Sequence, residues 1–161
     1  MANFSFDVAL GREVELYNRV LTNDPANSAL VLVVLTASGL EPDATLRTYS
    51  NLSALLAASN NEVTNAGYTR KVLTDADLVP YTVDTVNHKI TLPFPSQTYT
   101  AIAAGDSWRK LLVCYDADTT AGTDADIVPV CAQDLLVDNL PLVPNGGNIV
   151  LTWPLGLLTA S

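Results

Sequence analysis

Basic residues are few in this sequence, and the last of them is Lys110. Eight Lys and Arg stand against seventeen Asp and Glu, so the formal net charge is -9. The residues after Lys110 include six acids and no base. A surface of this sign repels phosphate backbones, so we expect no binding to nucleic acid. The charged fraction is only 16%, which leaves much neutral surface and favours self-association.

Reactive side chains are equally scarce. The only histidine is His88, and no Gly-x-Ser-x-Gly segment is present, so the sequence predicts no nucleophilic triad. His88 is expected in an exposed hairpin turn. One histidine and two cysteines without a Cys-x-x-Cys pair do not make a zinc site. We therefore expect a protein that is not an enzyme, with no catalytic, cofactor-binding or metal-binding residues.

Long apolar runs are also missing. The longest, residues 29–35, is far shorter than the roughly 20 residues that span a bilayer. The segment at the start, MANFSFDVALGR, lacks a basic region ahead of an apolar one, so no secretory signal is expected. The sequence thus favours a protein without membrane association.

The most informative segment that is present covers residues 106–134. Two apolar runs, residues 109–115 and 127–131, flank the polar connector 116–126. This arrangement predicts a β-hairpin with a long loop and a first strand buried on both faces. If the hairpin is symmetric about Gly122 and Thr123, its two cysteines face each other. A disulfide is then conceivable, but two buried free thiols are the favoured interpretation of Cys114 and Cys131.

The first third of the chain mixes helix and strand signals. Phe4, Phe6, Val8 and Leu10 alternate with polar residues, which predicts a strand or an extended N-terminal arm. Residues 12–21 have apolar spacing typical of a short helix, and residues 29–36 are typical of a buried strand. A second short helix is expected up to about residue 58. Its expected N-cap is Ser50.

From residue 68 the pattern is that of β structure. Expected strands cover residues 68–73, 81–86, 88–92, 97–102 and 148–153, besides the central hairpin. Short strands at this spacing predict a mainly β fold, an antiparallel sandwich or jelly roll with one or two short N-terminal helices. We expect one domain over residues 1–161: a possible arm at 1–10, a mixed region at 11–67 and a β-rich core at 68–153.

Three groups of side chains permit alternatives. Asp116, Asp118, Asp124 and Asp126 could form a loose calcium site, although the spacing fails the EF-hand pattern and solvated turns are favoured. The tryptophans, Trp108 and Trp153, could form a sugar platform, although packing in the core or an interface is favoured. A basic group could dock on an acidic protein if its members converge in space, although scattered solvated charges are favoured; its members are Arg70, Lys71, Lys89, Arg109 and Lys110.

Several segments resemble small structural proteins of tailed bacteriophages. They are NEVTNAGYTRKVL (61–73), ITLPFPSQTYTAI (90–102), GDSWRKLLVCYDADTTAGTDADIVPVC (105–131) and GGNIVLTW (146–153). The resemblance extends from about residue 16 onward. It implies a capsid cement or decoration protein that is made in the host bacterial cytoplasm and binds the major capsid protein on the outer surface of the head. It also implies a β-rich homo-oligomer, a dimer or trimer.

This resemblance implies that some apolar residues without an obvious place in the core make contacts between subunits. Residues 135–143 and 155–158 are expected to be exposed in the monomer and covered by neighbours in an assembly. The arm at 1–10 is expected to add a strand to an adjacent subunit. The alternative function is a surface or tail-associated module that binds host glycans.

Overall fold

The fold is built around one antiparallel sheet, as a computed structural model of residues 3–153 and 158–160 describes it. The sheet has the order β1-β8-β7-β2-β3 and does not close into a barrel. Three smaller sheets, β10-β9, β11-β6 and β12-β5-β4, complete the β structure. The mainly β prediction with short N-terminal helices is therefore confirmed.

The described elements follow each other along the chain in this order: β1 (Phe4–Ser5), η1 (Asp7–Ala9), α1 (Glu13–Leu21), β2 (Ala29–Thr36), α2 (Asp43–Leu46), α3 (Leu52–Ala57), β3 (Lys71–Leu73), β4 (Thr82–Asp84), β5 (Lys89–Leu92), β6 (Gln97–Tyr99), β7 (Trp108–Asp116), β8 (Val128–Asp134), β9 (Leu136–Val137), β10 (Leu140–Pro141), β11 (Ile149–Leu151) and β12 (Leu158–Ala160). No helix among these is long and apolar enough to cross a bilayer.

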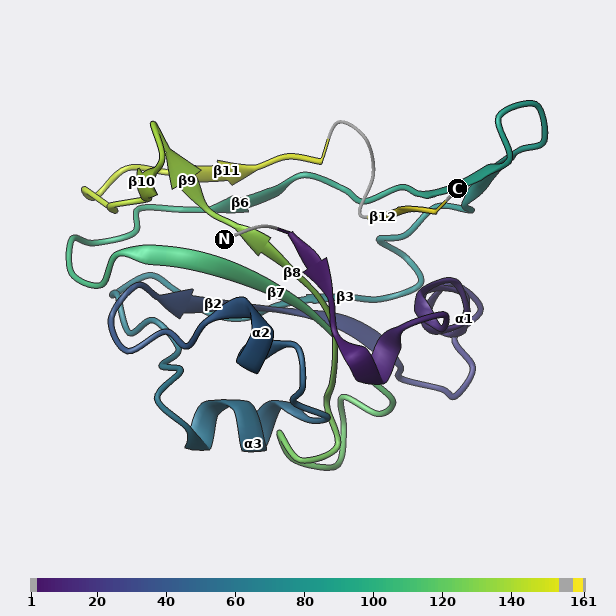
Figure 1. Cartoon of the computed structure of the whole chain (residues 1–161), viewed down its shortest axis with the longest axis horizontal. Helices are drawn as coiled ribbons and strands as arrows, with labels where there is room; N and C mark the ends of the chain where they lie inside the picture. Colours follow the sequence, from purple (N-terminus) through teal and green to yellow (C-terminus); the bar gives the residue numbers. More distant parts are fainter. Residues whose placement is uncertain (1–2, 154–157, 161) are drawn as a thin grey trace.

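The central sheet is covered on both faces. All eight residues of β2 are buried, because successive side chains point to opposite faces and both faces have a cover. On one face, Leu30, Leu32 and Val34 of β2 pack with residues of α1, β6 and β11. On the other face, Val31 and Val33 pack with residues of β1, α2 and α3. Figure 1 shows these three layers, with α2 and α3 below the sheet and β6, β9 and β11 above it.

The observed bounds agree best with the predicted ones where the local sequence pattern is strongest. β2 covers the predicted residues 29–36, and α1 covers most of the predicted 12–21. The tight hairpin of residues 82–92 and the two strands of the central hairpin are also present. The helix that ends at Ala57 begins one residue later than expected, because the side chain of Asn51, not that of Ser50, accepts from the Ala54 amide.

The predicted period-two strand over residues 3–10 is wrong beyond Ser5. Phe4 and Phe6 are buried, but the chain then turns into η1 and leaves Leu10 exposed. Strand β1 pairs with β8 of its own chain, and the Phe6 amide donates to the Val130 carbonyl. In this structure the segment is thus an edge strand of its own subunit.

The two cysteines do not face each other. A β-bulge between Val113 and Cys114 pairs Cys131 with Val113 and Cys114 with Pro129. Consequently Cys114 and Cys131 belong to the cores on opposite faces of the sheet. Both are buried free thiols, as the favoured interpretation predicted.

Candidate interaction surfaces

The predicted reactive residues stay apart in the structure. His88 is an exposed turn residue with a positive φ of 51° between β4 and β5. Within residues 3–153 and 158–160, no three His, Cys, Asp or Glu side chains gather in a way that could hold a metal ion.

The aspartates of the connector 116–126 serve the connector itself. Asp118 accepts from the amide and hydroxyl of Thr120, and Asp126 accepts from the amide of Thr123 at 2.9 Å. Asp124 turns away and accepts two hydrogen bonds from Arg70. The calcium alternative therefore has no shared ligand cluster, and the turn interpretation fits the contacts.

Arg70 links two segments that are far apart in the sequence. Its guanidinium lies 2.6 Å from Asp124 and 2.7 Å from Glu62, so it bridges the connector 116–126 to the segment before β3. Tyr68 donates to the same Glu62 carboxylate. The Arg70 side chain lowers the pKa of Asp124 through these charge-assisted hydrogen bonds. This cluster of side chains therefore joins two segments of the same subunit.

Lys110 lies in the core and its charge is paired there. Its side chain is fully buried, and its ammonium lies 2.9 Å from both Asp43 and Asp134. Asp134 also lies 3.4 Å from Arg109, and the Phe4 ring lies 4.8 Å from the Lys110 ammonium. These contacts join α2, β1, β7 and β8. The alternative of a basic docking group is not supported, because Arg70, Arg109 and Lys110 are ion-paired within the chain. The favoured interpretation, scattered solvated charges, is wrong for Lys110, which is buried.

The tryptophans do not form a sugar platform together. Trp108 is fully buried and donates from its indole nitrogen to the Asn65 side chain at 3.0 Å. Trp153 is partly buried, packs edge-on against Phe94 and donates to Gln133. Packing was the favoured interpretation, and the contacts of Trp108 agree with it.

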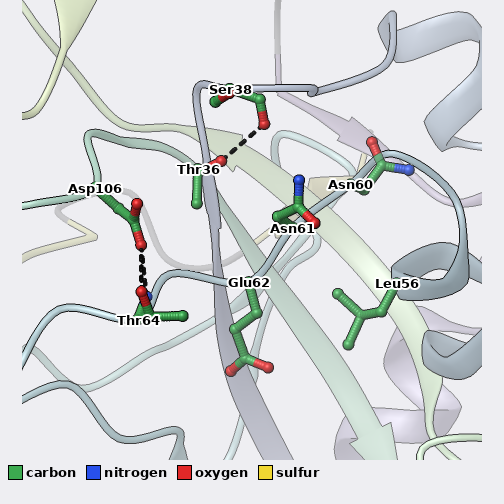
Figure 2. A pocket seen from close by; sticks show the side chains of 8 residues that line it. All are labelled: Thr36, Ser38, Leu56, Asn60, Asn61, Glu62, Thr64 and Asp106. Carbon is green, nitrogen blue, oxygen red and sulfur yellow. Dashed lines mark hydrogen bonds between the residues drawn. The ribbon is translucent and has the colours of Figure 1, made fainter.

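A polar depression of 420 Å³ opens beside the end of β2 and the segment 60–64 that follows α3. It is lined by Thr36, Ser38, Leu56, Asn60, Asn61, Glu62, Thr64 and Asp106. Figure 2 shows two of its hydrogen bonds: Thr64 donates to Asp106, and Thr36 donates to the Ser38 carbonyl. The Asp106 carboxylate also accepts from the Thr64 amide, and the amide, hydroxyl and carboxylate groups of the lining suit hydrogen bonding to a polar ligand.

A groove of 280 Å³ with both apolar and polar groups in its lining lies beside β9 and β11, and we call it the β9–β11 groove. Its lining residues are Leu111, Gln133, Asp134, Leu135, Leu136, Val137, Leu142, Val150, Leu151, Thr152 and Trp153. Leu136, Val137 and Val150 are also exposed to solvent, as are Leu140 and Val143 nearby in the chain. The expected exposure is thus confirmed for Leu136, Val137, Leu140 and Val143, whereas Leu135 is buried and Leu142 is partly buried against the core. The side chains of 155–158 lie outside the described residues.

The β4–β5 hairpin projects from one end of the molecule. It is the teal loop at the right of Figure 1, and β12 flanks it on one side. Val83 and Val86 are exposed on it, with Val86 at 84%. The Asp84 carboxylate accepts from the amides of Val86 and Asn87, which fixes the turn.

Comparisons with profiles of known protein families, with curated proteins and with solved structures found no match. The surfaces described above are therefore the structural basis for the function proposed below. Sequence reasoning missed the high exposure of Val86 and the burial of the Lys110 charge. Lys110 did give a signal, because it is a cation in a run of residues that are apolar on both sides of the strand.

Proposed function

We propose that this protein is a non-enzymatic structural component of a tailed-bacteriophage virion, a cement or decoration protein. It binds the major capsid protein on the outer surface of the head and stabilises the shell, after synthesis in the host cytoplasm. The observation that carries this proposal is the presence of exposed apolar side chains in two separate places, the β9–β11 groove and the β4–β5 hairpin, outside the doubly covered sheet. The sequence resemblance described above supports the same assignment.

A cement protein has to hold neighbouring subunits at a fixed distance. This requires a stiff body and two separate contact surfaces. The sheet supplies stiffness, because side chains on both of its faces are close-packed. Exposed apolar patches of this kind mark protein contacts. We include in this proposal that the layers form a sandwich-like or jelly-roll-like fold. We also include that the protein self-associates as a dimer or trimer.

The test is to mix the purified protein with undecorated capsids and to image them by cryo-electron microscopy. We expect regular density at fixed lattice positions and a higher melting temperature of the shell. Leu140→Asp, in the exposed apolar surface beside the β9–β11 groove, should lose this density. Leu10→Asp is the matched control, because Leu10 is similarly exposed, at 60% against 67%, and lies outside that surface. Wild-type protein that leaves the shell bare would refute the proposal.

A glycan-binding module is the second candidate. The polar depression favours it, because Asn61, Thr64 and Asp106 present the amide, hydroxyl and carboxylate groups that bind sugar hydroxyls. Titration calorimetry with host surface polysaccharide tests it. Binding that Asn61→Ala abolishes would move this function to first place.

A further inference from the structure

The two ends of the molecule carry features of opposite shape. The β9–β11 groove is concave and lined mostly by leucine and valine side chains. The β4–β5 hairpin is convex, and Val86 on it has the largest exposed fraction among the large apolar side chains that the structure describes. A β-branched side chain at a turn that is fixed by hydrogen bonds is a suitable group to fill an apolar pocket.

We propose that the β4–β5 hairpin of one copy docks in the β9–β11 groove of a second copy of this chain. Val86 enters the groove, and Val83 packs beside its rim. This contact deepens the self-association that is part of the proposed function, and it requires no capsid.

The positions of the two surfaces exclude this contact within one molecule. Figure 1 shows the hairpin at one end of the longest axis and β9, β10 and β11 near the other. One copy therefore offers a hairpin to its neighbour on one side and a groove to its neighbour on the other. Such a head-to-tail contact repeats until a ring closes or an open chain grows.

The hairpin is already held in a shape that can dock. Strand β5 pairs with β4 on one side and with β12 on the other. The Asp84 carboxylate accepts from the backbone amides of Val86 and Asn87 and from the Asn87 side chain at 2.7 Å. These hydrogen bonds lower the pKa of Asp84 and order the turn before binding, which reduces the entropy lost in the contact.

Charge favours a head-to-tail contact over a contact between two grooves. The chain has no Lys or Arg after Lys110, and Asp138 lies exposed at the turn between β9 and β10. Two grooves face to face would bring acids together. The hairpin instead carries one acid, Asp84, and one base, Lys89. Its approach therefore adds no net negative charge next to Asp138, and Lys89 is a cation that can pair with it.

Sedimentation velocity on the purified full chain, without capsids, tests the proposal through two single variants. Val86→Asp damages the hairpin and leaves the groove intact. Val150→Asp damages the groove, where Val150 is 58% exposed, and leaves the hairpin intact. Val72→Asp on β3 is the matched control, since Val72 is 49% exposed and lies in neither surface. Far-UV circular dichroism verifies that each variant folds.

The wild type and Val72→Asp should form oligomers, and each of the other two variants alone should weaken association at least about tenfold. Mixing Val86→Asp with Val150→Asp should restore association only as far as a dimer. In that pair the intact hairpin of the Val150→Asp copy docks in the intact groove of the Val86→Asp copy. The other hairpin and groove each carry an introduced Asp, and these two carboxylates repel each other.

Three outcomes would overturn the proposal. They are a wild type that remains monomeric, loss of association in Val150→Asp but not in Val86→Asp, and a mixture that stays monomeric. A monomeric wild type that still decorates capsids would refute this contact and leave capsid binding standing. Self-association without decoration would do the reverse.

Discussion

The least ordinary residue of this protein is a lysine in its core. The ammonium of Lys110 is paired with two carboxylates and lies against an aromatic ring. Moving such charges out of water is costly, and their mutual attraction offsets that cost only while the set is complete. The arrangement therefore makes the junction of α2, β1, β7 and β8 sensitive to the loss of a single member.

Lys110→Met should lower the free energy of unfolding by about 3 kcal/mol, because it leaves the Asp43 and Asp134 charges without their buried partner. Adding Asp43→Asn to this variant should recover part of the loss. Urea titration at neutral pH measures both effects. The control is Lys89→Met in the projecting hairpin, which we expect to change stability by less than about 0.5 kcal/mol. Equal losses in both single variants would contradict the role given to the buried pairs.

The two thiols should make the fold sensitive to alkali. Burial raises the pKa of Cys131 from an ordinary 9.0 to about 12 and that of Cys114 further. The native thiols thus stay protonated while the unfolded chain ionises, so stability is complete below pH 9 and decreases as the pH rises towards 12.

Between about pH 8 and about pH 9.5 we expect the free energy of unfolding to fall by about 1.5 kcal/mol. Replacing Cys114 and Cys131 with alanine should flatten this dependence, even though the starting stability is lower. Urea titrations at the two pH values measure the difference. An unchanged slope in the double variant would show that other groups cause the alkaline loss.

Among the elements, the connector 116–126 is joined to the segment before β3 by one cluster of ion pairs. Asp124 is held by Arg70, which also binds Glu62, so these side chains link the loop to the sheet edge. The Asp124 pKa is lowered by this contact. Its contribution to stability is therefore present above the ordinary carboxyl pKa and is lost as the pH falls through the native value.

Asp124→Asn should cost about 1 kcal/mol at neutral pH, a modest value because the partners are partly exposed. The difference from wild type should disappear in acid, where both proteins lack the charge. Added calcium should leave the melting temperature of the wild type unchanged. Chemical denaturation and thermal melts measure these effects, with exposed Asp75→Asn as the control. A calcium-dependent melting temperature would restore the metal site as an explanation.

Elements with a strong local pattern could be predicted, and those decided by tertiary contacts could not. The apolar run of β2 and the helical spacing of α1 were sufficient to place both elements. Helix α2 has only four residues, too few for a periodic signal. The bulge that separates the two cysteines makes Val130 the extra residue of β8, directly after Pro129. A proline inside an inner strand is typical of a bulge, so Pro129 was a signal that the symmetric hairpin overlooked. The β1 strand was predicted too long because its apolar alternation continues into η1.

For the whole molecule, composition and turn spacing were sufficient to predict a mainly β protein, but not the places of its contact surfaces. The groove forms only when β9, β11 and β7 come together from distant parts of the sequence. The exposed residues 136–143 could be recognised because apolar side chains there exceeded what the core needed. Val86 could not, because one valine in a polar turn is an unremarkable residue until its position at the tip of a projecting hairpin is known.

The double cover of the central sheet also bears on how the strands find their alignment. In most sheets a slip by one residue exposes apolar side chains, which opposes the error. Strands β2 and β7 are apolar on both faces, so after a one-residue slip apolar side chains would still face both cores. Lys110 breaks this equivalence, because a one-residue shift would turn its charge towards the aromatic core of Tyr99 and Trp108 and away from Asp43 and Asp134. The buried Lys110 ammonium thus specifies one register for the pairing of β7 with its neighbours.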